Sequence, residues 1–190
     1  MSNVTNLDLR AQRSRLALIE AGIELFIQNP NASLSDVATF AGVGRATLYR
    51  HFESRDDLIR TIAQDSLEKT DEVLLPLRQK KLKARELIEE GLKVIVPLAK
   101  HYHFLLSLWN IAAEDKKVMA IYKRQLKDLS ALIDEAKKQK AINKNLSTDW
   151  IVSMYDCVLY TSWYMVGQGM SEQDVIDHAI TSFFSGVEAN

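Results

Sequence analysis

The chain has 190 residues, of which 47% are hydrophobic and 26% charged, so it is long and apolar enough to bury a folded core. It holds only 7 Gly and 3 Pro, too few for the many tight turns of a multi-strand β protein, and this favours helix. The 24 Lys and Arg against 25 Asp and Glu give a net charge of -1, which excludes a generally basic nucleic-acid-binding chain. Any contact with DNA must therefore come from a local basic patch.

The cysteine content and the apolar runs indicate the compartment. The lone cysteine, Cys157, cannot form an intramolecular disulfide, and its apolar neighbourhood predicts a buried thiol in a reducing compartment. Residues 1–15 contain no apolar run, and no later segment approaches the ~20 uncharged apolar residues of a membrane span. We therefore expect a cytoplasmic protein with no membrane partner.

The first element in the chain is predicted to be a helix from about Leu9 to Gln28. Its apolar residues recur at intervals of three and four and form one wide face, which includes Leu16, Ile19, Ile23 and Phe26. The helix is expected to end at the segment 29–31, which reads Asn-Pro-Asn.

Two short helices are predicted next, separated by a sharp turn. Ser33 and Asp36 have the spacing of an N-terminal capping pair and start the first of them. Gly42 follows it, and glycine accepts the positive φ that a sharp turn requires. The second short helix is expected from about Arg45 to His51.

The spacing of small and apolar residues in these helices is typical of a helix-turn-helix. Two helices that cross steeply need a small residue at their contact, a glycine in the turn and an apolar residue facing back, and Ala38, Gly42 and Leu48 meet these needs. Val43 and Phe52 can close the same small core. The outward face of the second helix, which a major groove would receive, then carries Arg45, Ala46, Thr47, Tyr49, Arg50 and His51.

A local basic patch accompanies this pattern. Between Gly42 and Arg55 there are three arginines, at positions 45, 50 and 55, against one acid, Glu53, which makes a local excess of two positive charges. The balanced charge of the whole chain hides this excess. The hydroxyls of Thr47 and Tyr49 are also suited to phosphate oxygens.

The segment Ser33–Leu58, which reads SLSDVATFAGVGRATLYRHFESRDDL, resembles the DNA-binding signature of the TetR family of transcriptional regulators. In that signature a Gly-Val turn and a T-L-Y recognition helix are followed by an aromatic residue and by a basic residue that opens the next helix. The resemblance extends in pattern from about Leu16 to Ile62, and the rest of the chain matches only in length and helical character. Two departures are Gly44, where the family often has a capping serine, and Ala46, where glycine or proline is common.

The resemblance implies an all-α fold of about nine helices. An N-terminal helix-turn-helix head of three helices is expected in residues 1–70, with the motif at about 33–52, and a helical effector-binding and dimerisation domain in residues 71–190. The implied function is that of a ligand-responsive regulator that binds a double-stranded DNA operator sequence-specifically. Repression relieved by a small molecule is the family habit, although the sequence leaves activation open.

The resemblance also implies roles for single residues of the head. Arg45 and Ala46 match positions that reach base edges, where an arginine can donate to guanine O6 and N7. Arg50 adds to the exposed basic face. Taken one at a time, an arginine or tyrosine on a short exposed helix is usually just a solvated side chain. Phosphate contacts are implied for Ser33, Thr47, Tyr49, His51 and Arg55.

A fourth helix is predicted to join the head to the rest of the chain. Ser54 and Asp57 form a second capping pair, and the helix is expected to reach the vicinity of Leu74 and to end at Pro76. The resemblance implies that the tilt of this helix transmits effector binding to the head.

Five more helices are predicted, the first of which contains Pro97, where a kink or an end is expected. Aromatic and polar side chains follow, in the mixture that lines small-molecule sites, although plain core packing explains them too. No arginine lies within this cluster to pair a carboxylate, so a planar, poorly charged effector is expected. The predicted pocket residues are His101, Tyr102, His103, Trp109, Asn110, Tyr122, Tyr155 and Trp163.

The last two predicted helices carry apolar stripes broader than a small body needs on its inside. The resemblance suggests that they pair with the same helices of a second chain in a homodimer, and the alternative is internal packing alone. A two-fold dimer implies a palindromic operator. The predicted interface residues are Leu159, Val166, Ile176, Ile180, Phe183 and Phe184.

An enzyme is the first rival interpretation. His101 and His103 lie two apart, on nearly opposite sides of a helix, and so make poor partners on one metal ion. The sequence has no phosphate-binding glycine loop, no nucleophile elbow and no clustered cysteines, so we expect no catalytic residue, no metal and no cofactor. A second rival is a helical ligand carrier whose head no longer binds DNA.

Overall fold

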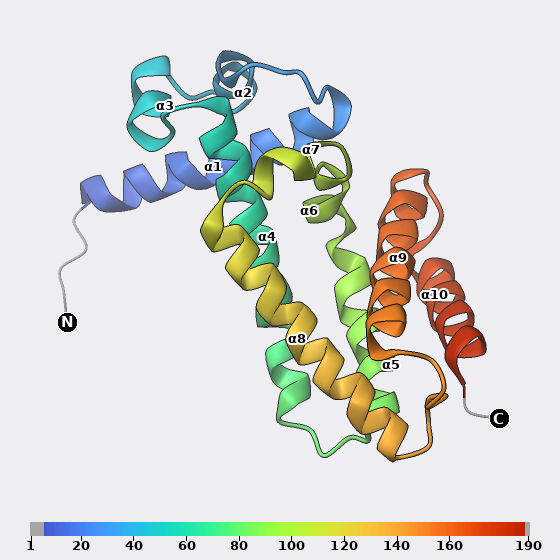
Figure 1. The fold of residues 1–190 in the computed structure, drawn as a ribbon. Helices are drawn as coiled ribbons and strands as arrows, with labels where there is room; N and C mark the ends of the chain where they lie inside the picture. Colours follow the sequence, from blue (N-terminus) through green and yellow to red (C-terminus); the bar gives the residue numbers. More distant parts are fainter. Residues whose placement is uncertain (1–5, 189–190) are drawn as a thin grey trace.

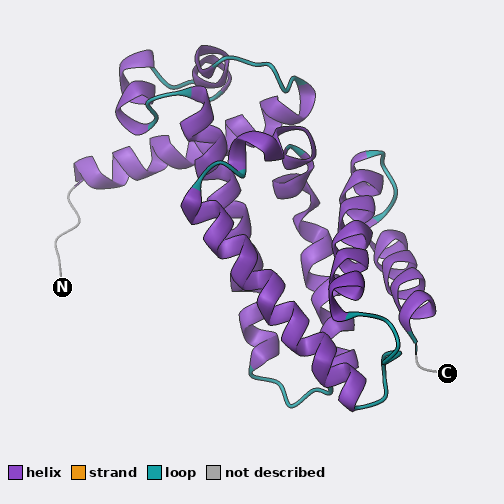
Figure 2. Ribbon diagram, in the orientation of Figure 1, coloured by secondary structure: helices purple, strands orange, loops and turns teal. Residues whose placement is uncertain are grey.

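Residues 6–188 are described by a computed structural model, in which they form an all-helical protein (Figures 1 and 2). Within this range there is no strand, only an isolated bridge between Ile142 and Glu188. The all-α prediction is confirmed. The elements are α1 (Asn6–Gln28), α2 (Leu34–Phe40), α3 (Arg45–His51), α4 (Arg55–Arg78), α5 (Ala84–Ile95), the 3-10 turn η1 (Val96–Leu98), α6 (Ala99–His103), α7 (Leu105–Ala112), α8 (Lys116–Lys138), α9 (Thr148–Gly167) and α10 (Glu172–Val187).

The three N-terminal helices form a head at one end of the molecule (Figure 1). The apolar face predicted for α1 packs against α2 and α3 around a small core, in which the side chains of Leu18, Phe26, Val37, Leu48 and Phe52 are buried. Because α2 and α3 have only seven residues each, this tertiary burial stabilises them more than their own backbone hydrogen bonds do.

A close crossing of α1 and α4 attaches the head to the body. A Cβ at Gly22 on α1 would lie 2.9 Å from Ile62 Cδ1 and 3.3 Å from Leu58 Cδ2, so only glycine permits this approach without a shift. Leu58, Ile59 and Ile62 of α4 are completely buried beneath it. Helices α1 and α4 are therefore in direct side-chain contact at this crossing.

The fourth helix is longer than the sequence predicts. Pro76 lies inside α4, which continues to Arg78, so the prediction that Pro76 ends the helix is wrong by two residues. A proline in the last turn removes one intrahelical donor only, and the amides of Gln79 and Lys80 close that turn on the carbonyls of Pro76 and Leu77.

The body surrounds the far half of α4. The predicted break at Pro97 is present, because the chain changes there from α5 through η1 to the single turn of α6 and then to α7. These breaks give ten α-helices among the described residues where about nine were expected. In Figure 1, α8 runs along α4, and α9 and α10 form the opposite wall of the body. None of the described helices is both long and apolar enough to cross a membrane.

Candidate functional site

The turn between α2 and α3 has the geometry that the sequence predicts. Gly42 has a φ of +65°, and the amide of Val43 donates to the carbonyl of Ala38 at 2.9 Å. Ala38 and Leu48 are buried where the two helices meet. Leu48 therefore faces inward and turns the opposite side of α3 to solvent. Gly44 precedes α3 and gives it no side-chain cap.

The start of α2 is fixed by the predicted capping pair. The Ser33 hydroxyl accepts from the amide of Asp36 at 3.2 Å and donates to Asp36 Oδ2 at 2.7 Å, while the Ser33 amide donates to the same oxygen at 2.8 Å. These bonds from Ser33 lower the pKa of the Asp36 carboxyl. Ser33 is exposed, but its hydroxyl already has a structural function.

The outer face of α3 is open and basic. Arg45, Ala46, Tyr49 and Arg50 are exposed, and Tyr49 keeps 56% of its surface accessible. Among the described residues, Arg45 and Tyr49 have no side-chain hydrogen bond or ion pair, whereas Arg50 Nη2 donates to Thr47 Oγ1 at 2.9 Å within the helix. The two unpartnered side chains are available to a ligand at no cost in protein contacts.

His51 lies at the half-buried edge of this face. Burial lowers the pKa of its imidazole, and the positive charges of Arg50 and Arg15 lower the pKa further. At neutral pH the ring is therefore uncharged. It can donate one hydrogen bond to a phosphate but adds no positive charge to the patch.

Arg55, for which a phosphate contact is predicted, is held by bonds within the head. Its Nε donates to the carbonyl of Ala32 at 3.0 Å, its Nη2 donates to the carbonyl of Pro30, and its guanidinium lies 5.1 Å from the centre of the Phe26 ring. The side chain thus stabilises the loop between α1 and α2. The sequence shows the positive charge of Arg55 but cannot show which groups its side chain contacts.

A second feature is a cavity of about 430 Å³ inside the body. Side chains of α4, α5, α6, α8 and α9 line it, and most of them are aliphatic or aromatic. This volume lies within the range of small-molecule sites, roughly 300–1,000 Å³. The cavity begins beside the middle of α4, at Leu67 and Thr70, about two turns beyond the crossing with α1.

The cavity contains only part of the predicted pocket cluster. Tyr102, Tyr122, Tyr155 and Trp163 line it. The other predicted pocket residues point elsewhere, because the breaks after Pro97 rotate α6 and α7 out of one continuous helical phase. His101 is half-buried near Asp65, His103 packs on Gly167, Trp109 packs edge-on against Tyr122 at 5.0 Å outside the lining, and Asn110 is exposed.

One lining residue was missed although the sequence contains a signal for it. Asp156 is the only charged residue between Trp150 and Gly167 of α9, a stretch otherwise composed of apolar, aromatic and small side chains. A single charge in such a helix is costly to bury and so indicates a specific function. Thr70 and Gln125 also line the cavity, and nothing in their sequence neighbourhood singles them out.

One wall of the cavity is bonded directly to α4. The ring of Tyr102 is stacked on that of Trp163, with centroids 4.0 Å apart. The Tyr102 hydroxyl donates to the carbonyl of Ser66 at 2.9 Å and is hydrogen-bonded to the hydroxyl of Thr70, and the Ser66 hydroxyl donates to the carbonyl of His101 at 3.0 Å. Desolvation raises the pKa of the Tyr102 phenol, which stays protonated.

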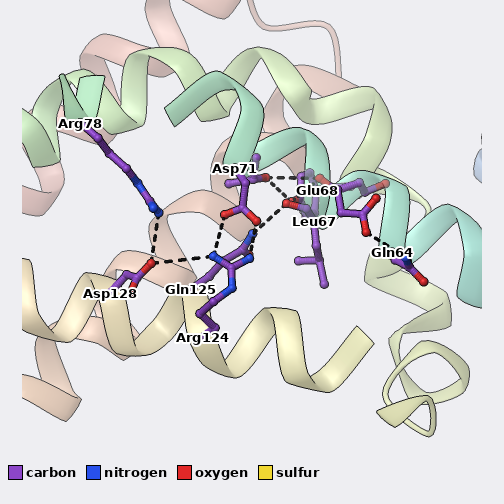
Figure 3. A network of polar contacts seen from close by, with 11 residues as sticks. Gln64, Leu67, Glu68, Asp71, Arg78, Arg124, Gln125 and Asp128 are labelled. Carbon is purple, nitrogen blue, oxygen red and sulfur yellow. Dashed lines mark hydrogen bonds and ion pairs between the residues drawn. The ribbon is translucent and has the colours of Figure 1, made fainter. Parts of the chain in front are cut away.

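A polar seam, defined as Leu67, Asp71, Arg78, Arg124, Gln125 and Asp128, joins α4 to α8 beside the cavity (Figure 3). Arg124 forms a two-pronged ion pair with Asp71, and Gln125 Nε2 donates to the carbonyl of Leu67 at 2.8 Å. Arg78 Nη2 lies 3.1 Å from Asp128 Oδ2. These groups are half exposed, so they orient the two helices more than they stabilise them.

Most of the predicted interface residues are covered by the protein's own core. Phe183 and Phe184 are buried and pack edge-on against each other, Ile176 is buried too, and Leu159 lines the cavity. These four cannot present surface to a second chain, which corrects that prediction. Val166 and Ile180 are half-buried. An exposed stripe on α9 lies beside them at intervals of three and four residues: Trp150, Ser153, Cys157, Tyr160 and Tyr164. Cys157 is exposed, so the prediction that its thiol is buried is wrong.

Comparison with known proteins links the head to one family. Residues 18–62 match the family model of the bacterial regulatory proteins, tetR family. The HTH-type transcriptional repressor LfrR of Mycolicibacterium smegmatis is 22% identical over 183 residues, which are 93% of this chain and 91% of the relative. An uncharacterized HTH-type transcriptional regulator of Haemophilus influenzae is 32% identical over 107 residues, 54% of this chain and 49% of the relative.

Solved structures extend the likeness to the whole fold. A crystal structure of LfrR superimposes with a TM-score of 0.75 at 20% identity and covers 94% of this chain and 98% of that one. The regulator KstR2 of Mycobacterium tuberculosis gives 0.75 at 14% identity, with 93% and 95% covered. The head therefore matches a family in sequence, and the body matches in fold. Residues 18–62 thus carry a DNA-binding region of the tetR family type, and the body shares the fold of the solved regulators.

Proposed function

We propose that this protein is a TetR-type transcriptional regulator that binds a palindromic DNA operator as a homodimer through the outer face of α3. A small molecule in the body cavity releases it. The observation that carries the proposal is the division of α3 into two sides. Leu48 is buried in the head core, while Arg45 and Tyr49 on the opposite side are exposed and have no partner among the described residues. Such a short polar helix fits the major groove.

Within the proposed interface the side chains divide by chemistry. Arg45, with Ala46 beside it, is placed to read base edges, because a guanidinium can donate twice to guanine. Thr47, Tyr49, Arg50 and His51 are assigned to phosphates, which set affinity and register. Ser33, exposed at the start of α2, is assigned one further phosphate contact, and Arg55 is omitted because its Nε and Nη2 already donate to loop carbonyls.

The exposed stripe of α9 supports a dimer. Trp150, Tyr160 and Tyr164 keep 60%, 52% and 46% of their surface accessible, more than a monomer gains by exposing large aromatic rings. A groove of about 620 Å³ runs beside the stripe between α9 and α10 and is lined by Met154, Met165 and other residues. The same face of a second chain would cover both by two-fold symmetry. The two α3 helices would then lie about 34–36 Å apart, one duplex turn.

The contacts of α4 support a route from the cavity to the head. A molecule that separates Tyr102 from Trp163 must disturb the hydrogen bonds of Tyr102 with Ser66 and Thr70 on α4. The polar seam keeps the other side of α4 on α8, so α4 tilts rather than shifts as a whole. The crossing at Gly22 passes this tilt to the head. We place the boundary between head (1–70) and effector domain (71–190) inside this continuous helix.

Repression is the proposed sign of regulation, and an aromatic compound is the proposed effector type. The relative LfrR is a repressor, and its structure was solved in complex with proflavine. Here the cavity wall of Tyr102, Tyr122, Tyr155 and Trp163 offers flat apolar surface for a ring compound.

A gel-shift assay tests DNA binding through α3. Duplex DNA flanking the protein's own gene is expected to be shifted by the wild type and not by the double variant Arg45→Ala, Tyr49→Ala. Lys127→Ala, which removes an exposed cation from α8 in the body, is the matched control and should retain the shift. A band that survives the double variant unchanged would overturn the assignment.

A further inference from the structure

The cavity contains one carboxylate that lacks a positive partner. Asp156 Oδ2 accepts a hydrogen bond from the Tyr122 hydroxyl at 2.8 Å, and its other oxygen accepts none from the described residues. No Lys, Arg or His among residues 6–188 lies within ion-pair distance of either oxygen. A half-buried carboxylate without a cation is an expensive arrangement in a protein interior.

The other charges of the lining are already paired. Arg78 and Asp128 also border the cavity, and they form an ion pair with each other at 3.1 Å. Asp128 lies 3.9 Å from Arg124 as well, which in turn binds Asp71. The polar seam is therefore close to neutral, and the charge that remains inside the lining is the single negative charge of Asp156.

The unpaired carboxylate of Asp156 makes the cavity favourable for a cation. Desolvation raises the pKa of the Asp156 carboxyl, and the hydrogen bond from Tyr122 opposes this only in part. A positive group brought within a few ångströms would stabilise the ionised form strongly in this poorly solvated place. A negative group would meet both the carboxylate and the apolar wall, and would be rejected.

The shape and chemistry of the rest of the wall define the remainder of the ligand. Tyr122 and Tyr155 border Asp156 on α8 and α9, and Tyr102 and Trp163 form a stacked pair in the same lining. Aromatic faces attract cations as well as flat apolar rings. Aliphatic side chains of α4, α5 and α8 supply the rest of the lining.

We propose that the effector is an organic cation, an ammonium or amidinium group on a flat apolar body, whose charge pairs with Asp156 and whose rings lie among the four aromatic side chains. This inference rests on the proposed role of the cavity as the effector site. It replaces the sequence-based expectation of a poorly charged effector, because the position of Asp156 was not known from the sequence pattern.

Three anthracene derivatives of one size test the charge preference: one with an aminomethyl group, one with a hydroxymethyl group and one with a carboxylate. Their fluorescence gives dissociation constants for the full-length protein at neutral pH. The aminomethyl compound is expected to bind at least about tenfold more tightly than the alcohol, which equals about 1.4 kcal/mol. The carboxylate is expected to bind most weakly.

Asp156→Asn keeps the shape of the side chain and removes its charge. This variant should bind the cation and the alcohol about equally, with the affinity for the alcohol preserved. Asp149→Asn, at an exposed position in the first turn of the same helix, is the matched control and should keep the tenfold preference. Tyr122→Phe, which retains the carboxylate, should also keep it.

Three outcomes would overturn the cation assignment: equal binding of all three compounds by the wild type, a preference that survives Asp156→Asn, or binding of none of them. Each outcome is independent of the gel shift. A charge preference without DNA binding would refute only the proposed function, and DNA binding without a charge preference would refute only the inference about the ligand.

Discussion

The outer face of α3 and the body cavity are built on opposite principles. The face on α3 consists of exposed side chains, of which Arg45 and Tyr49 have no partner in the protein, and it is supported from behind by the buried Leu48. The cavity consists of buried side chains that already bond to their neighbours, as Tyr102 does to Ser66 and Thr70. The α3 face is therefore separate from the contacts that stabilise the fold, whereas the cavity wall consists of residues that make such contacts.

This difference teaches where binding and stability are coupled. A side chain on the α3 face can be removed without unfolding the head, because it contributes nothing to the core. A side chain in the cavity wall cannot be changed without altering contacts of α4, and this is the property that a switch requires. Substitutions on α3 should therefore separate DNA binding from stability, and substitutions in the cavity wall should change both stability and effector response.

The largest expected effect distinguishes the two sides of α3. Leu48→Ala should lower the free energy of unfolding by about 2–5 kcal/mol, because it leaves a hole in a completely buried core. Tyr49→Ala, at the next position, should change it by no more than about 0.5 kcal/mol while weakening DNA binding. Urea denaturation measures both. Equal losses of stability would break the proposed division of the helix.

The next effect concerns Arg55, whose guanidinium bonds to the loop between α1 and α2. Arg55→Ala should destabilise the head by about 1–3 kcal/mol, because the carbonyls of Ala32 and Pro30 lose their donor. The salt dependence of DNA binding should keep its slope. A slope reduced by about one in the logarithmic plot would instead identify Arg55 as a phosphate contact.

Tyr102→Phe tests the coupling between the cavity and α4. It removes the hydroxyl that bonds to Ser66 and Thr70 and keeps the ring stacked on Trp163, so the stability should fall by about 1 kcal/mol. Effector-dependent release of DNA should weaken while effector binding persists, as fluorescence titration and gel shifts on the same sample would record. Unchanged release would remove Tyr102 from the route.

The smallest effect is a pH dependence from Asp156. Because desolvation raises its pKa in the folded state, the folded protein holds this proton more tightly than the unfolded chain does. Stability should therefore fall as the pH rises from the ordinary Asp pKa of 3.8 through the raised pKa of the folded state. Above the raised pKa the loss of stability is complete.

Asp156→Asn has no carboxyl group to ionise, so it should be more stable than the wild type at neutral pH. The difference in the free energy of unfolding should shrink near pH 3.8. Denaturation of both proteins at the two pH values gives the comparison. A variant less stable than the wild type at neutral pH would show that the carboxylate has a stabilising partner.

The two regions also differ in how much the sequence could predict. In the head, the turn, the cap at Ser33 and the inward side of Leu48 depend on residues within 20 positions of one another, and local spacing determines them. The cavity joins α4, α5, α6, α8 and α9, and which aromatic rings meet there depends on breaks around Pro97 whose angles no periodicity gives. His103 and Asn110 were assigned to a pocket for their chemistry and point away from it. The apolar stripes of α9 and α10 did not show which of their residues the monomer itself covers: Phe183 and Phe184 are buried, whereas Tyr160 and Tyr164 are exposed.

The central claim is that the exposed face of α3 reads duplex DNA in a two-fold arrangement. Selection of bound sequences from random duplexes by the purified protein tests it most directly, with the double variant Arg45→Ala, Tyr49→Ala selected in parallel. The account predicts that the wild type enriches a palindrome whose half-sites are centred about one duplex turn apart, and that the variant enriches nothing. The same palindrome recovered by the variant, or no enrichment by the wild type, would contradict it.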